Sequence, residues 1–192
     1  MNILDYAKGA EPCQRNWDYS QLIPEQDIEY ITKVCTTMPT RQNLNTYQLY
    51  VVTNRDTISK IYNVAYNPDD YKNTFLLNSQ VSAPLLLIWS ASIEYHALNT
   101  DVSFAVGISS AAAAFASVEL GYRTGFCKCF DRQKVKRILK TGGKKFEAEP
   151  MLMLGIGHPN NDLTHNVVLR PDGSAVSKES RSGTKNIKIT KI

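Results

Sequence analysis

The sequence predicts a single domain of mixed helix and sheet, because segments with helical periodicity alternate along the chain with short apolar and β-branched segments. Its 192 residues suit one compact domain, and no internal repeat, low-complexity tract or linker divides them. Hydrophobic residues make up 43% of the chain and charged residues 21%, which suffices for a core without cross-links and excludes a disordered chain.

Four segments predict strands. The segment 47–53 (YQLYVVT) is rich in aromatic and β-branched residues, which favour strands. The segments 84–90 (PLLLIWS) and 151–156 (MLMLGI) are continuous apolar runs, typical of strands buried on both faces. The segment 186–192 (NIKITKI) alternates isoleucine with lysine, which indicates an edge strand.

Helices are predicted between these strands. Proline at the first helical position and an acidic first turn open a helix at Ile23-Pro24-Glu25, which ends before Pro39. A second amphipathic helix is marked by Ile58, Ile61, Tyr62 and Ala65, and a short one is expected through Leu76 and Leu77. A further helix is capped by Asp131 and closed by glycines at 142–143.

A small-residue helix is predicted from about Asp101 to Leu120, ending at Gly121. Small residues on every side of a helix indicate close burial among other elements. We expect the run at 104–121 (FAVGISSAAAAFASVELG) to be too short and too rich in serine to span a bilayer, which requires about 20 strongly apolar residues.

Charge and cysteine content limit the functional classes. The net charge of +4 is mild and does not by itself indicate nucleic-acid binding. From residue 170 onward six basic residues face two acidic ones, so this tail can meet a phosphate group, a nucleic acid or only water. The chain starts without an apolar export signal, so we expect four free thiols and a cytoplasmic protein.

Several nucleotide and metal motifs are missing from the sequence. No G-x-G-x-x-G follows a strand and no P-loop signature occurs, so P-loop nucleotide hydrolysis is unsupported. Cys127 and Cys129 form C-x-C, but no second pair completes a four-ligand zinc set, and we predict no metal site. Two buried or spectator thiols are favoured there over a redox dithiol.

Residues 38–52 resemble a segment of the nitroreductase family that reads roughly Pro-Ser-x-x-Asn-x-Gln-Pro-Trp before an apolar strand. Pro39, Thr40 and Asn43 match its proline, serine and asparagine, and Thr46 stands at its second proline. The start at 11–17 (EPCQRNW) resembles the family's Arg-x-Ser-x-Arg/Lys-x-Phe opening. There Arg15 matches the second basic residue, Cys13 replaces serine and Glu11 replaces arginine.

The later part of the chain also resembles this family. A long small-residue helix ends at Gly121-Tyr122, a turn containing Thr-Gly follows at 124–131, and the third strand ends in Gly155-Ile156-Gly157 before a basic tail. The resemblance implies an α+β nitroreductase-like fold. Its central sheet is mixed and mostly antiparallel, helices flank it, and a long buried helix lies at a homodimer interface. All of 1–192 then forms one FMN-binding domain, with 170–192 a basic C-terminal extension that packs on the partner subunit.

The resemblance also implies the chemistry. FMN lies at the dimer interface, NAD(P)H reduces it, and a small-molecule acceptor such as a nitroaromatic or quinone is reduced by ping-pong hydride transfer through flavin N5. The flavin supplies the reacting atom, so we assign no catalytic side chain. We expect no membrane partner, and a nucleic-acid partner is unlikely. The sequence carries no fingerprint that decides between NADH and NADPH.

The candidate FMN-binding residues follow from that alignment. Arginine binds a phosphate dianion through a planar fork of donors, which makes Arg15 the first choice and Arg181 the tail candidate, with Lys178 and Lys185 as substitutes. The loop from Pro39 to Asn43 is expected against the flavin of the other subunit. The full set is Cys13, Gln14, Arg15, Pro39, Thr40, Arg41, Asn43, Asn78, Lys128, Cys129 and Arg181.

Within this set, Asn78 is favoured over Gln80 as the amide near the flavin. Lys128 and Cys129 stand where a backbone amide meets flavin N5 or O4 and would stabilise the reduced flavin. Glu11 opposes the assignment, since a carboxylate beside a phosphate repels it unless it turns away. Two rival hypotheses remain: an FMN carrier or sensor without turnover, motivated by the changes at Glu11, Cys13 and Thr46, and a nucleic-acid-binding protein that uses the basic tail.

Overall fold

A computed structural model describes residues 2–66, 77–92, 100–140 and 149–160, together with the backbone of short strands at 167–169 and 175–177. Its elements in chain order are α1 (Ile3–Ala10), α2 (Glu25–Thr36), the 3-10 turn η1 (Arg41–Asn43), β1 (Tyr47–Val52), α3 (Arg55–Tyr62), the 3-10 turn η3 (Ser79–Ser82), β2 (Leu85–Ala91), α4 (Thr100–Glu119), β3 (Arg123–Cys127), α5 (Arg132–Lys140), β4 (Pro150–Gly157), β5 (Val167–Leu169) and β6 (Ala175–Ser177).

The central sheet has four strands in the order β1-β2-β4-β3, and every neighbouring pair is antiparallel. All seven residues of β2 are buried, as its apolar run predicts. The pair β5-β6 forms a separate two-stranded sheet. The predicted α+β class, with a mostly antiparallel sheet between helices, is confirmed.

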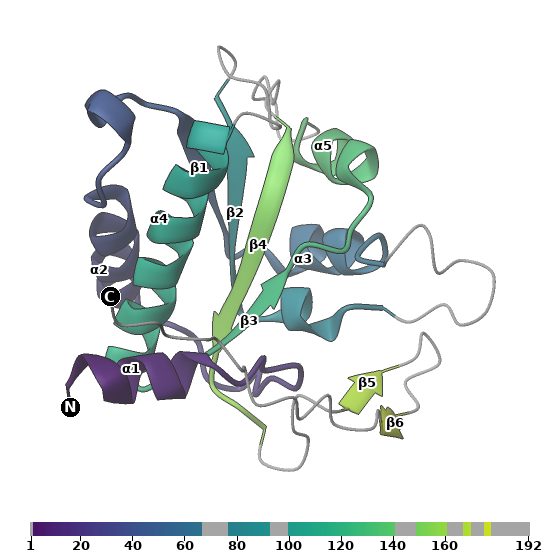
Figure 1. Ribbon diagram of the computed structural model, residues 1–192. Coiled ribbons are helices and arrows are strands. Elements are labelled where there is room, and N and C mark those ends of the chain that lie inside the picture. The colour runs from purple at the N-terminus through teal and green to yellow at the C-terminus, as the bar shows by residue number, and fades with distance from the viewer. Residues whose placement is uncertain are drawn as a thin grey trace.

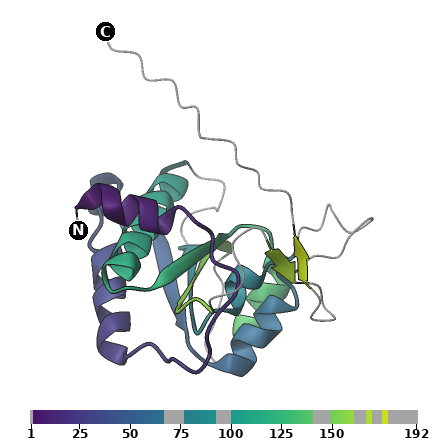
Figure 2. The same cartoon turned by 90° about the horizontal axis from the view of Figure 1, so that it is seen from below.

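Helices cover both faces of this sheet (Figure 1). One face packs against α2 and α4, where Leu85, Leu87 and Trp89 of β2 join a cluster with Ile31 of α2 and Val106 of α4. The other face packs against α3 and α5. Seen from below, α1 lies beside α4, on the side of the sheet away from α3 and α5 (Figure 2).

Successive side chains of a strand point to opposite faces, so Leu86 and Ile88 of β2 join the apolar cluster between the sheet and the helices α3 and α5.

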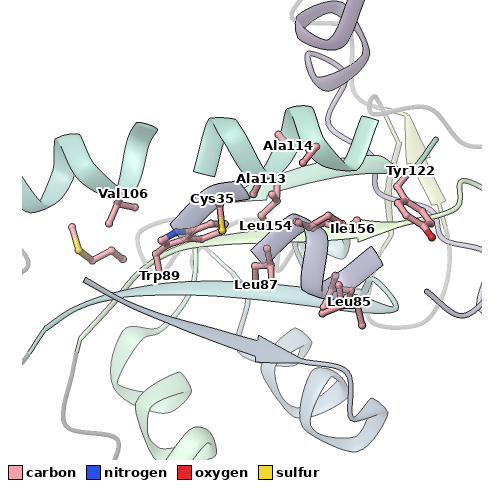
Figure 3. Packing of buried hydrophobic residues seen from close by; sticks show 14 of the residues in the cluster. Cys35, Leu85, Leu87, Trp89, Val106, Ala113, Ala114, Tyr122, Leu154 and Ile156 are labelled. Carbon is pink, nitrogen blue, oxygen red and sulfur yellow. The ribbon is translucent and has the colours of Figure 1, made fainter. Parts of the chain in front are cut away.

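Two buried hydrogen bonds fix the helices on the first face. The Trp89 indole donates to Ser109 Oγ over 2.9 Å, joining β2 to α4. The Tyr122 hydroxyl donates to Asp27 over 2.5 Å, joining the start of β3 to α2. Figure 3 shows Trp89 and Tyr122 among the apolar side chains between the sheet and these helices. Each buried polar tip is satisfied while its ring contributes apolar burial.

The structure matches most elements expected from sequence. The strands at β1, β2 and β4 are present, and α4 lies within one residue of its predicted bounds. Asp131 caps α5 by accepting from the backbone N–H of Lys134 over 3.0 Å. Pro24 is the N-cap of α2, so this helix begins one residue later than predicted, at Glu25. The expected helix at Leu76, the closing glycines at 142–143 and the strand at 186–192 lie outside the described residues.

Helix α1 and the strands β3, β5 and β6 were not predicted. Helix α1 is opened by a capping box, in which Asn2 accepts from the Asp5 backbone and the Asp5 side chain accepts from the Asn2 backbone. The stretch 124–131 was interpreted as a turn, but its first four residues belong to strand β3. Glycine in the middle of that strand hides the strand pattern, because it lowers strand propensity.

The length argument against a membrane span was wrong for α4. This helix has 20 residues with a mean hydropathy of 1.5 in its most apolar window, enough by length and composition to cross a bilayer. The burial of α4 indicates a core helix, because 56% of that window is buried inside the protein, as in the core helix of a globular domain.

Candidate functional site

The residues 13–15 lie along the outer edge of β3, the last strand of the sheet. The backbone N–H of Gln14 donates to the Thr124 carbonyl over 2.8 Å, and the Cys13 thiol lies 3.7 Å from the Phe126 carbonyl. Gly125 permits this approach, because a Cβ there would stand 2.3 Å from the Gln14 carbonyl oxygen. The glycine that weakens the strand pattern of β3 in the sequence therefore leaves the space in which residues 13–15 lie.

Arg15 is held half-buried by this arrangement. Its Nε is buried without a hydrogen-bond partner, and none of the ion pairs among the described residues involves it. A buried guanidinium nitrogen without a partner is costly, and an anion bound by the guanidinium would offset that cost. Burial raises the pKa of the neighbouring Cys13 thiol, although the Arg15 charge acts in the opposite direction.

The end of β3 is held by two amide side chains. Asn78 Nδ2 donates to the Cys129 carbonyl over 3.0 Å, and Gln80 Nε2 donates to the Phe126 carbonyl over 3.2 Å. The Cys127 thiol also lies 3.4 Å from the Cys129 carbonyl. The predicted residues Cys13, Gln14, Arg15, Asn78, Lys128 and Cys129 thus lie along β3 and the turn that follows it. Lys128 and Cys129 are exposed there, on the turn that leads into α5.

Gln80 was the less favoured amide, and the structure gives it the more constrained position. It is 4% exposed, and its Oε1 has no hydrogen-bond partner. A Cβ on Gly155 would lie 1.9 Å from the backbone carbonyl oxygen of Gln80, so β4 must carry glycine at that point. The sequence signal for this contact was the glycine of the third strand, which was used only as a family feature.

The second predicted group, the loop 39–43, lies elsewhere. Its contacts run within the loop, where Thr40 Oγ1 donates to the Leu44 carbonyl over 2.8 Å, and to the start of α4, where Arg41 pairs with Asp101 over 2.5 Å. Gln42 and Asn43 adopt left-handed backbone angles, with φ of 52° and 56°. The loop belongs to the sheet face covered by α2 and α4, whereas the 127–131 turn leads to α5 on the other face (Figure 1).

The remaining predicted residues divide between exposure and lack of description. Pro39, Arg41 and Asn43 are exposed and Thr40 is half-buried. Arg181 and its substitutes Lys178 and Lys185 lie outside the described residues. Among the described residues, no group of three or more His, Cys, Asp or Glu side chains is arranged to hold a metal ion, and all four cysteines are free thiols.

Helix α4 carries an exposed apolar stripe. Phe104 is 67% exposed and Ile108 is 42% exposed, one turn apart on the same side of the helix. Gly107 between them has no atom within 4 Å of the position a Cβ would take. Ile3 and Leu4 of the neighbouring α1 are also exposed. Large apolar side chains gathered on one surface mark a contact site more often than scattered ones do.

Comparison with known proteins gives a fold but no close relative. No model of a protein family matches the sequence, and no curated protein matches it. Among solved structures, a nitroreductase family protein from Clostridium novyi NT aligns over 84% of this chain and 87% of its own, with a TM-score of 0.68 and 15% identity.

Two further structures give the same result. A putative NADH oxidase from Clostridium acetobutylicum aligns over 98% of this chain and 100% of its own, with a TM-score of 0.66 and 17% identity. An FMN-dependent nitroreductase from Clostridium difficile R20291 aligns over 84% and 90%, with a TM-score of 0.66 and 14% identity. The chain therefore has the fold of the nitroreductase family proteins.

Proposed function

We propose that this protein is an FMN-dependent oxidoreductase that uses NAD(P)H. The observation that carries the proposal is Arg15, a half-buried arginine whose Nε has no hydrogen-bond partner. It lies at the position where the resemblance to nitroreductases predicts a residue that binds the FMN phosphate. The fold supports it, because one structural neighbour is described as an FMN-dependent nitroreductase and another as a BluB-like flavoprotein from Clostridium difficile 630.

The residues around the end of β3 fit FMN in charge and in donor type. Arg15 would bind the phosphate together with the backbone amide of Cys13, whereas the amide of Gln14 already donates to the Thr124 carbonyl. The exposed backbone at Lys128 and Cys129 would face the reactive edge of the ring, where N–H donors stabilise negative charge. Bound FMN would take hydride from NAD(P)H and pass it to a nitroaromatic, quinone or similar conjugated acceptor in ping-pong order.

The protein's own contribution is binding and orientation. The hydrogen bonds from Asn78 and Gln80 fix the carbonyls of Cys129 and Phe126, and so limit the positions that the following amides adopt. Positioning of this kind lowers the entropic cost of bringing donor and acceptor together. No described side chain is assigned to proton transfer.

The proposal includes a homodimer. The exposed stripe of Phe104, Gly107 and Ile108 supplies an apolar helix face, and glycine lets a second helix approach closely. In such a dimer the loop 39–43 of one subunit would complete the flavin site of the other, since it does not join the Arg15 group within one chain. The tail 170–192, with Arg181, would pack on the partner. A cytoplasmic location belongs to the same proposal.

The absorbance spectrum of the purified protein, followed by anaerobic titration with NADH and NADPH, tests this function. We expect a yellow dimer with one FMN per subunit that bleaches on addition of a reduced nicotinamide cofactor. Colourless protein that also fails to bind added FMN would contradict the proposal.

The second candidate is an FMN carrier or sensor, favoured by the thiol of Cys13 and the carboxylate of Glu11 at the phosphate end. It predicts a yellow protein whose flavin is not reduced by either cofactor in stopped-flow mixing.

A further inference from the structure

The segment before β2 carries two amide side chains, Asn78 and Gln80, on a backbone that its neighbours hold in place. The Trp17 indole donates to the Ser79 carbonyl over 3.0 Å, and Ser79 and Gln80 are both buried. The Gln80 carbonyl packs against Gly155 of β4, where a Cβ would lie 1.9 Å away. Because their backbone is fixed, each of the two amides meets a defined partner.

The Gln80 amide contacts the outer edge of β3. Gln80 Nε2 donates to the Phe126 carbonyl over 3.2 Å, and the Cys13 thiol lies 3.7 Å from the same oxygen. Two residues earlier on this edge, the Thr124 carbonyl accepts from the Gln14 backbone over 2.8 Å. A carbonyl oxygen has two lone pairs, so that of Phe126 can accept from both groups. One edge of β3 therefore holds both Gln80 and the N-terminal site residues.

Gly125 gives a second contact between the same two groups. A Cβ on Gly125 would lie 2.3 Å from the Gln14 carbonyl oxygen and 2.6 Å from Gln80 Cβ. The Gln80 side chain and the Gln14 backbone thus pack over one glycine. A side chain of another shape at position 80 would displace the Gln14 backbone, since packed interiors leave little free volume.

Cys13 continues these contacts to Arg15. Burial raises the pKa of the Cys13 thiol, while the charge of Arg15 and a hydrogen bond from its side chain act in the opposite direction. The guanidinium therefore lies beside the thiol that meets the Phe126 carbonyl. Arg15 Nε and Gln80 Oε1, at the two ends of this series of contacts, are both buried without a hydrogen-bond partner. Such atoms are rare in folded proteins and require a reason, which a bound anion supplies for Arg15.

We propose that Gln80 is a positioning residue for the phosphate end of the flavin site, because it holds residues 13–15 in the place from which Arg15 reaches the phosphate. The inference rests on the proposed function, which assigns the phosphate to Arg15. Asn78, two residues earlier, donates to the Cys129 carbonyl over 3.0 Å and serves the ring end of the site. The two amides therefore support different parts of one ligand, and a flavin without a phosphate separates their effects.

The test compares FMN with riboflavin, which has the same ring and ribityl chain but no phosphate. Fluorescence titration of the flavin-free full chain gives the Kd of each flavin, and the ratio of the two Kd values measures the phosphate contact. Gln80→Met removes the amide and keeps about the same side-chain volume, and Asn78→Leu does the same at the other amide. Gln26→Met replaces an exposed amide of α2 and is the control.

Hydrogen exchange at the Gln14 amide gives a second readout, which needs no flavin. This amide donates to the Thr124 carbonyl, so its exchange reports how firmly residues 13–15 are held on β3. Gln80→Met should speed this exchange by about two- to tenfold, the effect of one lost hydrogen bond. Gln26→Met and Asn78→Leu should leave it unchanged.

We expect the natural protein to bind FMN about ten- to a hundredfold more tightly than riboflavin. Gln80→Met should lower that ratio by about two- to tenfold and keep the riboflavin affinity within about twofold, which also shows that the variant is folded. Gln80→Glu should lower the ratio further, because a carboxylate near Arg15 competes with the phosphate for the guanidinium. Asn78→Leu should weaken the binding of both flavins by the same factor and leave the ratio unchanged.

Equal losses of FMN and riboflavin affinity in Gln80→Met would overturn the inference and leave flavin binding intact, because Gln80 would then have only a structural role. A ratio and a Gln14 exchange rate that both stay unchanged in Gln80→Met would also overturn it. If the natural protein binds neither flavin, the proposed function fails. Gln14 exchange that is faster in Gln80→Met than in Gln26→Met would still support the positioning of residues 13–15 by Gln80, and equal exchange would overturn it.

Discussion

The two groups of predicted site residues differ in how the chain holds them. Residues 13–15 are held at the edge of β3 by the backbone hydrogen bond of Gln14 and the thiol contact of Cys13. A glycine in β3 leaves room for them. The loop 39–43 is exposed, contains two left-handed residues and is joined to the start of α4 by a surface ion pair. One group is built into the sheet of its own chain, whereas the other is presented outward.

This difference explains why a single chain holds only part of the proposed site. Residues that must meet a ligand within their own subunit are best fixed by their own sheet. Residues that meet a ligand in another subunit must project from the surface near the subunit contact, as the exposed Asn43 does in the loop that Arg41 joins to the start of α4. The comparison therefore gives the loop a function only if α4 is a dimer contact.

The largest effect is expected from charges placed on the α4 stripe. The double variant Phe104→Lys/Ile108→Lys should be monomeric by analytical ultracentrifugation and should lose FMN, because both halves of each site separate. Leu22→Lys is the matched control, since Leu22 is 78% exposed and belongs to the segment before α2 and not to α4. A double variant that remains a dimer would exclude this helix face as the contact.

The next largest effect is expected at Arg15. Removing a charge-assisted phosphate contact costs about 1.5–3 kcal/mol, so Arg15→Ala should weaken FMN binding by about ten- to a hundredfold in a fluorescence titration. Arg123→Ala removes an exposed arginine from the start of β3, the strand beside which residues 13–15 lie, and should leave the FMN affinity unchanged. Equal losses in the two variants would show that general positive charge, and not the seat of Arg15, binds the phosphate.

A smaller effect is expected from the buried thiols at high pH. Burial raises the pKa of Cys35 to about 11 and that of Cys127 to about 12, from an ordinary value of 9.0. Because the folded values are the higher ones, this contribution to stability is complete below pH 9 and is lost as the pH rises toward 11–12. Urea unfolding should therefore give a free energy of unfolding that falls between pH 8.5 and 10.5, by about 1–2 kcal/mol for each thiol.

The exposed Cys129 supplies the control for that pH series. Cys127→Ala should remove about half of the pH dependence, because Cys35 remains, and should lower stability at every pH by opening a small cavity. Cys129→Ala should leave the slope unchanged. A slope that is the same in all three proteins would assign the alkaline loss to other groups.

The smallest effect is expected at the base of the loop. Arg41 and Asp101 form a pair with 64% and 35% exposure, and such surface pairs contribute about 0–1 kcal/mol. Asp101→Asn should shift the unfolding midpoint only slightly, with an FMN affinity within about threefold of the natural protein. A tenfold loss of FMN would show that the pair sets the conformation of the loop and not only its surface charge.

Periodicity and composition predicted the central strands and the long helices, because their patterns follow from burial. The apolar run of β2 and the small residues of α4 each carry a signal that depends on their own segment. β3 was missed because its Gly125 is selected by contacts with residues 14 and 80, which are distant in sequence. α1 was missed because none of its residues is buried, so no burial pattern marks it, and its signal is the capping box of Asn2 and Asp5.

The same limit applies to the candidate site. Arg15 and Cys129 were singled out from the order of motifs, and their common placement beside β3 and after it depends on a strand that the sequence did not reveal. Asn78 and Gln80 are both amide residues before a strand, so the sequence pattern does not show that Gln80 has the more constrained position. Only the packing of its carbonyl against Gly155 distinguishes it. Sequence patterns named the residue types, while the register of β3 and β4 determined which of them meet.

Subunit complementation tests the shared site most directly. Arg15→Ala damages the fixed group and Asn43→Ala damages the loop, and each homodimer should bind FMN weakly at both of its sites. A mixed dimer, isolated with two different affinity tags, would then hold one site with both changes and one with neither. We predict that the mixed dimer binds one FMN per dimer with the affinity of the natural protein. Two weak sites and no restored one would contradict a flavin site built from two copies of this chain.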